Sequence, residues 1–273
     1  MTHPVVRRLL IDLETPFARH WHGGDAFRTA FSNALSMSFP LGEQFFIDSV
    51  RAGLKALPES EGERFAAEVQ GFVGQEATHR RVHALFNLQL ERQGYANVWE
   101  ERIRRRLPQL QGLDARHAVA ATAANEHFTA VLAGWLLSHT EWFTDTEPRL
   151  ATMWMWHASE ELEHCSTAFD VYLALGGNQR WRARWMRIVT WYFLSDLAVQ
   201  TWSNLKHDGV QWRWSTWKGA LSYLFGRAGL VRCSFGAWRA YFRRGFHPSQ
   251  ADGSPGRRWL DEHRAAYTAV GQH

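Results

Sequence analysis

The feature that most constrains this sequence is a Glu-x-x-His motif that occurs twice. The first copy is Glu76 and His79 in the stretch QEATH, and the second is Glu161 and His164 in the stretch HASEELEH. Residues three positions apart lie on the same face of an α-helix. If both stretches are helical, each motif places a carboxylate beside an imidazole, and such a pair can bind one metal ion.

A single glutamate precedes each motif at nearly the same distance. Glu43 lies 33 residues before Glu76, and Glu126 lies 35 residues before Glu161. Aromatic and aliphatic residues follow both glutamates, in the stretches GEQFFI and NEHF. Because burying an uncompensated charge is costly, we expect these carboxylates to be paired or metal-bound. The matched order and spacing indicate an internal duplication of a helix pair.

The sequence is mostly helical in pattern and shows no convincing alternation typical of β-strands. Only 8 prolines occur in the chain, and several of them lie where a helix can begin or end. We therefore predict an all-α fold with four core helices between residues 39 and 176 and additional C-terminal helices. The expected helices are 26–37 after an Asp25 N-cap, one from Pro40 to near Pro58, 60–93, 114–139, 148–176, 180–206, and a glycine-interrupted pattern over 209–245.

Length and composition set broad limits on the class of protein. The 273 residues suit one large domain or two small ones. Two cysteines give no disulfide framework, which suits a reducing compartment. The stretch MTHPVVRRLLIDLETPF lacks the apolar core of a signal peptide, and no apolar run has the length of a membrane span. We expect a cytoplasmic protein that either is freely soluble or contacts the inner face of the membrane peripherally.

The chain divides by composition into four segments. We predict an N-terminal helical lead-in over 1–38, a dimetal bundle over 39–178, a helical addition rich in Trp and Arg over 179–247, and a polar tail over 248–273. The oligomeric state is left open by the sequence.

Four carboxylates and two imidazoles form a chemically coherent ligand set. Ferritin-like di-iron and di-manganese bundles use one Glu from each of two helices and a Glu-x-x-His from each of the other two. The carboxylates offset the charge of two divalent ions, and imidazole nitrogens suit iron. A lone Glu-x-x-His is usually a surface pair, but the joint pattern favours two metal ions, either Fe or Mn. The predicted ligands are Glu43, Glu76, His79, Glu126, Glu161 and His164.

Several neighbouring residues have more than one interpretation. His83 and His157 each lie one helical turn from a motif, where each can be an additional ligand, a group that orients the ligands, or an ordinary core histidine. Asp48 and Asp170 can either hydrogen-bond a ligand imidazole or face water.

Within HASEELEH, two further carboxylates raise a question of register. Glu160 has no histidine three positions later, whereas Glu161 has His164. We therefore prefer Glu161 as the ligand and interpret Glu160 and Glu163 as bystanders on other faces of the helix.

The sequence resembles a bacterial family described as predicted metal-dependent hydrolases. The resemblance lies in FPLGEQFFIDSVR, QEATHRRVHALFN, NEHFTA and WHASEELEHCSTAFDVY, which span residues 39–172. It implies a ferritin-like bundle with a dinuclear site on the six predicted ligands.

The ligand set favours an O2-activating di-iron oxidase or oxygenase that acts on an apolar or lipid-like substrate and needs an electron donor if it is an oxygenase. The four ligand glutamates would carry catalysis. The alternatives are a metal-dependent hydrolase with a metal-bridging hydroxide and non-catalytic metal binding. A tyrosyl-radical role is disfavoured, because among the tyrosines only Tyr172 lies near a ligand helix.

Residues 180–245 combine tryptophans with basic residues. Eight of the 15 Trp of the chain occur here, and 12 Arg and Lys stand against only Asp196 and Asp208. This composition is typical of a membrane-interface segment. It equally suits a helical cover whose aromatic residues pack on the bundle. Nucleic acid is a weaker third partner, because no recognition motif accompanies the basic residues and the net charge is only +4.

Overall fold

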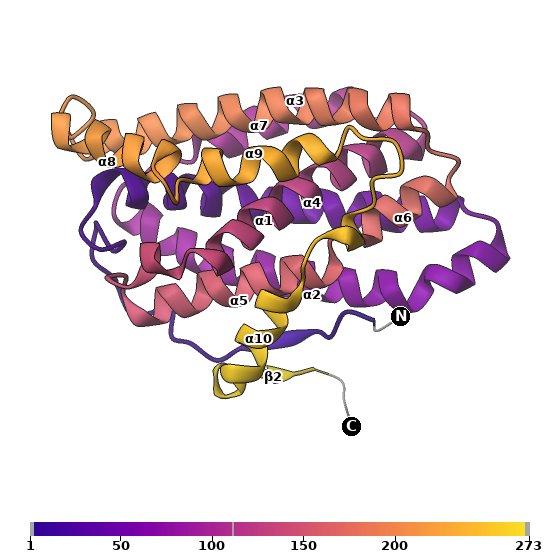
Figure 1. Ribbon diagram of the computed structural model, residues 1–273, viewed down its shortest axis with the longest axis horizontal. Helices are drawn as coiled ribbons and strands as arrows, with labels where there is room; N and C mark the ends of the chain where they lie inside the picture. The colour runs from indigo at the N-terminus through magenta and orange to yellow at the C-terminus, as the bar shows by residue number, and fades with distance from the viewer. Residues whose placement is uncertain (1–2, 111, 271–273) are drawn as a thin grey trace.

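The computed structural model describes residues 3–110 and 112–270 and confirms the predicted all-α fold (Figure 1). Helices dominate, and the strands are limited to one short antiparallel pair. The elements are β1 (Arg7–Leu9), α1 (Ala26–Ala56), α2 (Glu59–Arg92), α3 (Val98–Arg106), α4 (Ala115–Ser138), α5 (Pro148–His164), α6 (Thr167–Ala174), α7 (Gln179–His207), α8 (Trp214–Phe225), α9 (Leu230–Ala240), α10 (Ser254–Glu262) and β2 (Tyr267–Ala269).

Helices α1, α2, α4 and α5 pack around a common core and are the helices that carry the predicted ligands. Helix α1 packs against α2 and α4, and α5 packs against α4 and α2. The predicted aspartate caps are present: the side chain of Asp25 accepts a hydrogen bond from the Arg28 amide, and that of Asp114 accepts one from the Arg116 amide. These caps fix where α1 and α4 begin and therefore the register of their ligands.

Helix α1 is one continuous helix, so the prediction of two helices separated before Pro40 was wrong. Proline lacks the N–H that would donate to the carbonyl four residues earlier. That carbonyl belongs to Ser36, and it accepts a hydrogen bond of 2.9 Å from the Asn87 side chain on α2 instead. The helix passes through residue 38, where the first two predicted segments meet. The division into four segments itself stays a prediction.

The structure differs from the predicted helices in two other places. The single helix expected over 148–176 is divided into α5 and α6 directly after His164, although no glycine or proline marks the break. Helix α3, which precedes the ligand helix α4, was not predicted. Its sequence VWEERIRRR is too short and too charged to show a clear apolar stripe.

The N-terminal segment lies across α2, and this position depends on two glycines. A Cβ atom at Gly71 would meet the backbone and ring of Pro4, and one at Gly74 would meet the side chain of Val6. Strand β1 then pairs with β2 in an antiparallel register. This arrangement brings Arg7, a strand residue, close to the core of the bundle.

Helices α7, α8 and α9 lie along one edge of the bundle, and α10 lies at the opposite edge (Figure 1). Helix α7 packs against α1 and α4, α8 against α1, and α9 against α4. Among the described helices, none is long and apolar enough to cross a membrane.

Candidate metal centre

The structure brings all six predicted ligands together in the core of the bundle. Each is buried, with at most 4% of its surface exposed, and they come from four helices. Ligand atoms lie within 4.8 Å of one another in overlapping groups that could hold a metal ion. The groups are Glu43 with Glu76 and His79, Glu76 with Glu161 and His164, His79 with His157 and Glu161, and Glu43 with His83 and His157.

His164 lies among three of the predicted glutamates. Its Nε2 atom is 3.2 Å from Glu76 Oε1, 3.2 Å from Glu126 Oε2 and 3.6 Å from Glu161 Oε1. Its Nδ1–H donates to the side-chain oxygen of Gln75 at 2.8 Å. This hydrogen bond places the proton on Nδ1 and leaves the Nε2 lone pair facing the carboxylates, which is the orientation that a metal ligand requires.

His79 is held by Glu160, a carboxylate that we had interpreted from the sequence as a bystander. Its Nε2 lies 2.9 Å from Glu160 Oε2, and its Nδ1 lies 3.3 Å from Glu161 Oε1. Arg7 donates to the other oxygen of Glu160 at 3.1 Å. Glu160 is fully buried, and its hydrogen bond to His79 orients the imidazole. Its interpretation as a bystander was therefore wrong. The register preference for Glu161 agrees with the geometry, because Glu161 faces both motif histidines.

Glu163 is the other supposed bystander, and it supports His164 through Gln75. It accepts hydrogen bonds from Arg7 and from the Gln75 amide nitrogen, each at 2.7 Å. The amide of Gln75 is thereby fixed with its oxygen toward His164. The helical spacing held a signal for part of this network, because Gln75 lies four residues before His79 on the ligand side of α2. Arg7 carried no such signal, since it lies 153 residues from Glu160.

A directed chain of hydrogen bonds orients the two histidines whose role the sequence left open. Asn87 donates its N–H to a backbone carbonyl, so its oxygen accepts from Ser36 Oγ at 2.8 Å. Ser36 Oγ then accepts from His83 Nδ1 at 2.8 Å, and His83 Nε2 accepts from His157 Nδ1 at 2.7 Å. The Nε2 lone pair of His157 consequently faces Glu161 Oε1 at 2.9 Å. A lone pair and a carboxylate oxygen this close need a proton or a cation between them.

The carboxylate oxygens of the cluster are short of hydrogen-bond partners. Buried polar groups in proteins are almost always satisfied, and a buried carboxylate without a partner is costly. The donor set of carboxylate oxygens and imidazole nitrogens fits a divalent transition metal. Atoms without a hydrogen-bond partner among the described residues are both oxygens of Glu43, Glu76 and Glu126, one oxygen of Glu161, His79 Nδ1 and His164 Nε2.

Burial and the charges of the cluster raise the pKa values of three of its groups. Burial, followed by the charge of Glu76, raises the pKa of Glu43 well above its usual value and that of Glu126 to about 8. Burial opposes protonation of His79, but the neighbouring carboxylates of Glu160 and Glu161 outweigh it and raise the His79 pKa to about 10. The cluster therefore retains protons at neutral pH, and a bound cation would replace them.

The two aspartates considered as partners of ligand imidazoles lie elsewhere. Asp48 accepts a hydrogen bond from Gln44 at the surface, and Asp170 pairs with His247 at 2.7 Å. Neither contacts a histidine of the cluster in the part of the chain that the structure describes. The carboxylates next to His79 come from α5, whereas those next to His164 come from α2, α4 and α5.

Together, the helical fold and the cluster of buried glutamates and histidines define a metal-dependent protein built on a helical bundle. The family model described as predicted metal-dependent hydrolase matches residues 5–252, so the chain belongs to that family. This confirms the resemblance found in the sequence. No curated protein and no solved structure matches the chain, and the ferritin-like assignment stays a prediction.

Removal of the support behind His79 should weaken metal binding without removing a ligand. We expect Glu160→Ala to lower the affinity for Mn²⁺ or Fe²⁺ by about 10-fold to 100-fold, as is typical when the group that orients a ligand histidine is lost. Glu160→Gln keeps an acceptor for the His79 N–H and should lose less. Calorimetric titration of the metal-free proteins with metal ions measures both effects. Equal affinities for the unmodified protein and the two variants would contradict the role of Glu160.

Proposed function

We propose that the chain is a metal-dependent enzyme whose active centre holds two metal ions, Fe or Mn, beside an apolar substrate cavity. The observation that carries the proposal is the group of partnerless buried carboxylate oxygens and imidazole nitrogens in the core. Membership of a family described as predicted metal-dependent hydrolases supports hydrolysis as the reaction.

The residues divide naturally between two ends of the cluster. His164, Glu76 and Glu126 would hold an ion at one end, and His79 and Glu43 would hold one at the other. Glu161 approaches both His79 and His164 and is the carboxylate best placed to serve both ions. The Nε2 lone pair of His157, which faces Glu161, could supply a further nitrogen ligand.

Metal ions in such a centre would lower the pKa of a bound water molecule and polarise the bond to be cleaved. The chain supplies the groups that handle the proton. Glu43 lacks a hydrogen-bond partner among the described residues, so its carboxylate could accept a proton from that water. Phe39 packs its ring 4.8 Å from that of His157, and an apolar ring in this position would help to exclude water from the centre.

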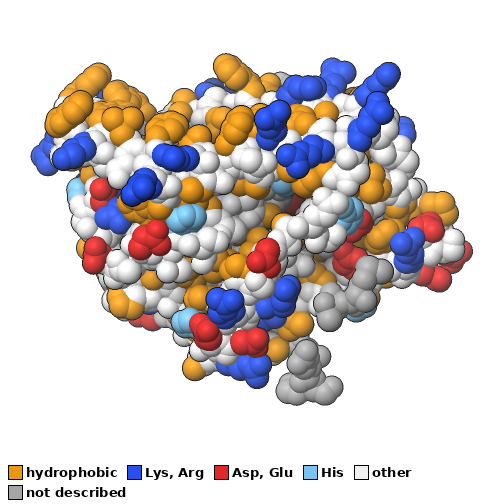
Figure 2. Space-filling view, viewed as in Figure 1, with side chains coloured by type: hydrophobic (Ala, Val, Ile, Leu, Met, Phe, Trp, Pro, Cys, Tyr) orange, Lys and Arg blue, Asp and Glu red, His pale blue; other side chains and the backbone are white. Residues whose placement is uncertain are grey.

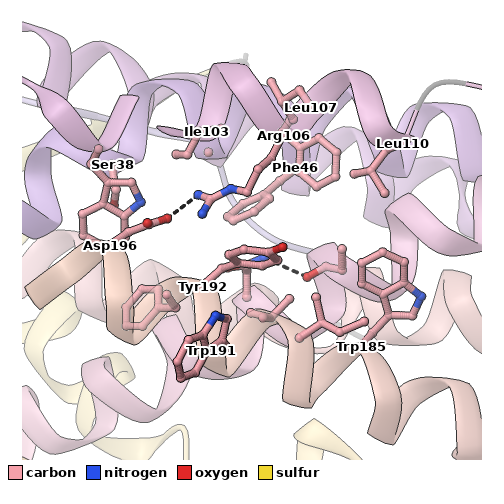
Figure 3. A pocket seen from close by; sticks show the side chains of 18 of the residues that line it. Ser38, Phe46, Ile103, Arg106, Leu107, Leu110, Trp185, Trp191, Tyr192 and Asp196 are labelled. Atoms are coloured by element: carbon pink, nitrogen blue, oxygen red, sulfur yellow. Dashed lines mark hydrogen bonds and ion pairs between the residues drawn. The ribbon is translucent and has the colours of Figure 1, made fainter. Parts of the chain in front are cut away.

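A cavity of about 640 Å³ lies between α1, α3, α4 and α7 (Figure 3). Its volume falls in the range of about 300–1,000 Å³ that is usual for small-molecule sites. None of the predicted ligands lines it directly. A second cavity of about 50 Å³ is lined by His157 and Glu161, and Phe39 and Thr129 line both cavities. A substrate in the large cavity would therefore approach the metal centre past Phe39 and Thr129.

The walls of the large cavity suit an apolar substrate. Phe46, Ile103, Leu110 and Trp185 contribute to a lining that is mostly aromatic and aliphatic (Figure 3). A charged group at one end is Arg106, which pairs with a buried aspartate of α7 and lies 4.4 Å from the centre of the Tyr192 ring. A substrate with a long apolar body and one polar end would match this distribution.

The activation of O2 by a di-iron form is a second candidate function. The specific observation behind it is the ligand set, since two Glu-x-x-His motifs and two further glutamates are the inventory of di-iron carboxylate bundles. An oxidase or oxygenase of this kind would need an electron donor. The apolar cavity favours this reaction as well, because it would shield a reactive centre from water.

An assay of one metal-free preparation separates the two reactions. After chelation, the protein is reloaded with Zn²⁺, Mn²⁺ or anaerobic Fe²⁺ and tested on p-nitrophenyl esters and phosphoesters of increasing chain length. A hydrolase should show metal-dependent turnover that falls by at least about 100-fold in Glu161→Gln. An oxygenase should instead take up O2 only in the iron form, measured with an oxygen electrode. The absence of both activities with every metal tested would contradict an enzymatic role.

A further inference from the structure

Helices α7, α8 and α9 expose an unusual number of large apolar side chains. Trp191 is 72% exposed, Trp212 is 79% exposed and Trp214 is 76% exposed, whereas tryptophan in soluble proteins is highly buried on average. Phe225 and Phe235 are also exposed on the same helices. The space-filling view shows hydrophobic side chains together with Lys and Arg along the edge formed by α7, α8 and α9, which we call the α7–α9 face (Figure 2).

Packing of aromatic residues against the bundle accounts for only some of the tryptophans in residues 180–245. Trp238 fits that interpretation, since its indole N–H donates to Thr190 at 3.1 Å. Trp214 has no comparable hydrogen bond among the described residues, and the ring of Trp212 lies edge-on to that of Trp202, another exposed residue. Side chains in this position leave their apolar surface in water unless another surface covers it.

The charge of the α7–α9 face has one sign. Of the 12 Arg and Lys in residues 180–245, all but Arg182 are exposed. The two acidic residues of the segment are buried: Asp196 is paired with Arg102 and Arg106, and the side chain of Asp208 is 2% exposed. The face therefore combines exposed aromatic groups with positive charge that no acidic group of the segment balances at the surface.

We propose that the α7–α9 face docks on an anionic membrane surface, with its tryptophans inserted at the level of the lipid headgroups. Tryptophan favours that interface, and basic residues are attracted to anionic lipids. A second copy of the chain fits less well, because a symmetric dimer would place like charges against each other. A nucleic acid would use the cations but not the exposed aliphatic and phenylalanine side chains.

The docking would place the mouth of the large cavity at the lipid. Arg187, Trp191 and Tyr192 line that cavity, and Trp191 is largely exposed, so the cavity reaches the surface on α7. An apolar substrate could then pass from the bilayer to the cavity without crossing water. This consequence rests on the proposed function, whereas the docking itself does not.

Vesicle co-sedimentation tests the docking with the full chain. We expect the protein to sediment with vesicles that contain phosphatidylglycerol, to bind phosphatidylcholine vesicles far more weakly, and to dissociate as salt rises. The double variant Trp212→Ser/Trp214→Ser should lower the partition coefficient by about 10-fold or more. Arg213→Gln/Lys218→Gln should lower binding to anionic vesicles and leave the weak binding to neutral ones unchanged.

A matched control comes from the opposite edge of the molecule. Arg257 and Arg258 are exposed on α10, which lies far from α7 in Figure 1. The variant Arg257→Gln/Arg258→Gln removes the same charge as Arg213→Gln/Lys218→Gln and should bind vesicles like the unmodified protein. An equal loss in both charge variants would mean that net charge alone governs binding, and it would overturn the assignment of the face.

Cys233 provides a native reporter because it is exposed on α9, whereas the other cysteine is buried. An environment-sensitive fluorophore on Cys233 should shift to shorter wavelength with anionic vesicles. The same label on Ser60→Cys in a Cys233→Ser background should not shift. Absence of sedimentation at any salt concentration, displacement of the protein from vesicles by RNA, or a concentration-dependent dimer that buries Cys233 without lipid would each overturn the proposal.

Discussion

The replacement of Glu161 or Glu76 by alanine should deprive the protein of most of its metal. Each side chain faces a motif histidine, and Glu161 approaches both of them. The loss of a direct carboxylate ligand removes one charge and one donor, so we expect the affinity to fall by at least about 100-fold, more than for the loss of an orienting group. Elemental analysis of protein purified from its own host measures the effect.

The control for this prediction is Glu63→Ala, which removes an exposed carboxylate from the same helix as Glu76. Its metal content should equal that of the unmodified protein. Glu161→Gln retains the volume of the side chain and separates a loss of ligand from a loss of packing. Unchanged metal content in both Glu76→Ala and Glu161→Ala would refute the site.

The second large effect concerns stability and its dependence on pH. Metal removal should lower the Tm by about 10 °C at pH 8, the shift expected when a ligand is present far above its dissociation constant. The physical reason is that the metal compensates carboxylates that otherwise stay buried without partners. Differential scanning calorimetry with and without chelator measures the difference.

The sign of the pH dependence follows from two raised pKa values. The pKa of Glu126 rises from 4.5 to about 8, and that of His79 rises from 6.5 to about 10. At a pH between the unfolded and the folded pKa of each group, the metal-free folded state binds more protons than the unfolded state. The stability of the metal-free protein therefore falls as pH rises through this range. Metal binding strengthens over the same range, because the ligands release their protons.

The gain in Tm from bound metal should consequently increase between pH 6.5 and pH 8.5. A set of scans at constant ionic strength in that window checks the trend. A gain that decreases as the pH is raised would mean that protons and metal do not compete for these side chains, and it would argue against the assigned ligands.

The sequence was sufficient for the elements whose signals are local. Asp25 and Asp114 begin helices as predicted, because an N-cap acts within one turn. Pro40 was misleading for the opposite reason. Whether a proline ends a helix depends on the fate of one carbonyl, and here the compensating donor, Asn87, lies 51 residues away from Ser36. No local pattern contains that information.

The same distinction applies to the candidate site. The six residues could be singled out because helical spacing and chain order are visible in the sequence, and the structure brings their side chains together. Their role as metal ligands stays a prediction. The supporting groups were missed or misread, since Glu160 looks like an ordinary surface acid until Arg7 and His79 are seen on either side of it. Tertiary contacts of this kind decide which carboxylates are ligands and which orient ligands.

The pairing of β1 with β2 has a consequence for handling the protein. Arg7 sits in β1, opposite Ala269 of β2, and it holds both Glu160 and Glu163 behind the motif histidines. Proteolytic trimming or a bulky fusion that displaces β2 would therefore weaken the contacts of Arg7 with Glu160 and Glu163, although no predicted ligand would be lost. A preparation shortened for convenience can remain folded and helical and still report too low a metal occupancy.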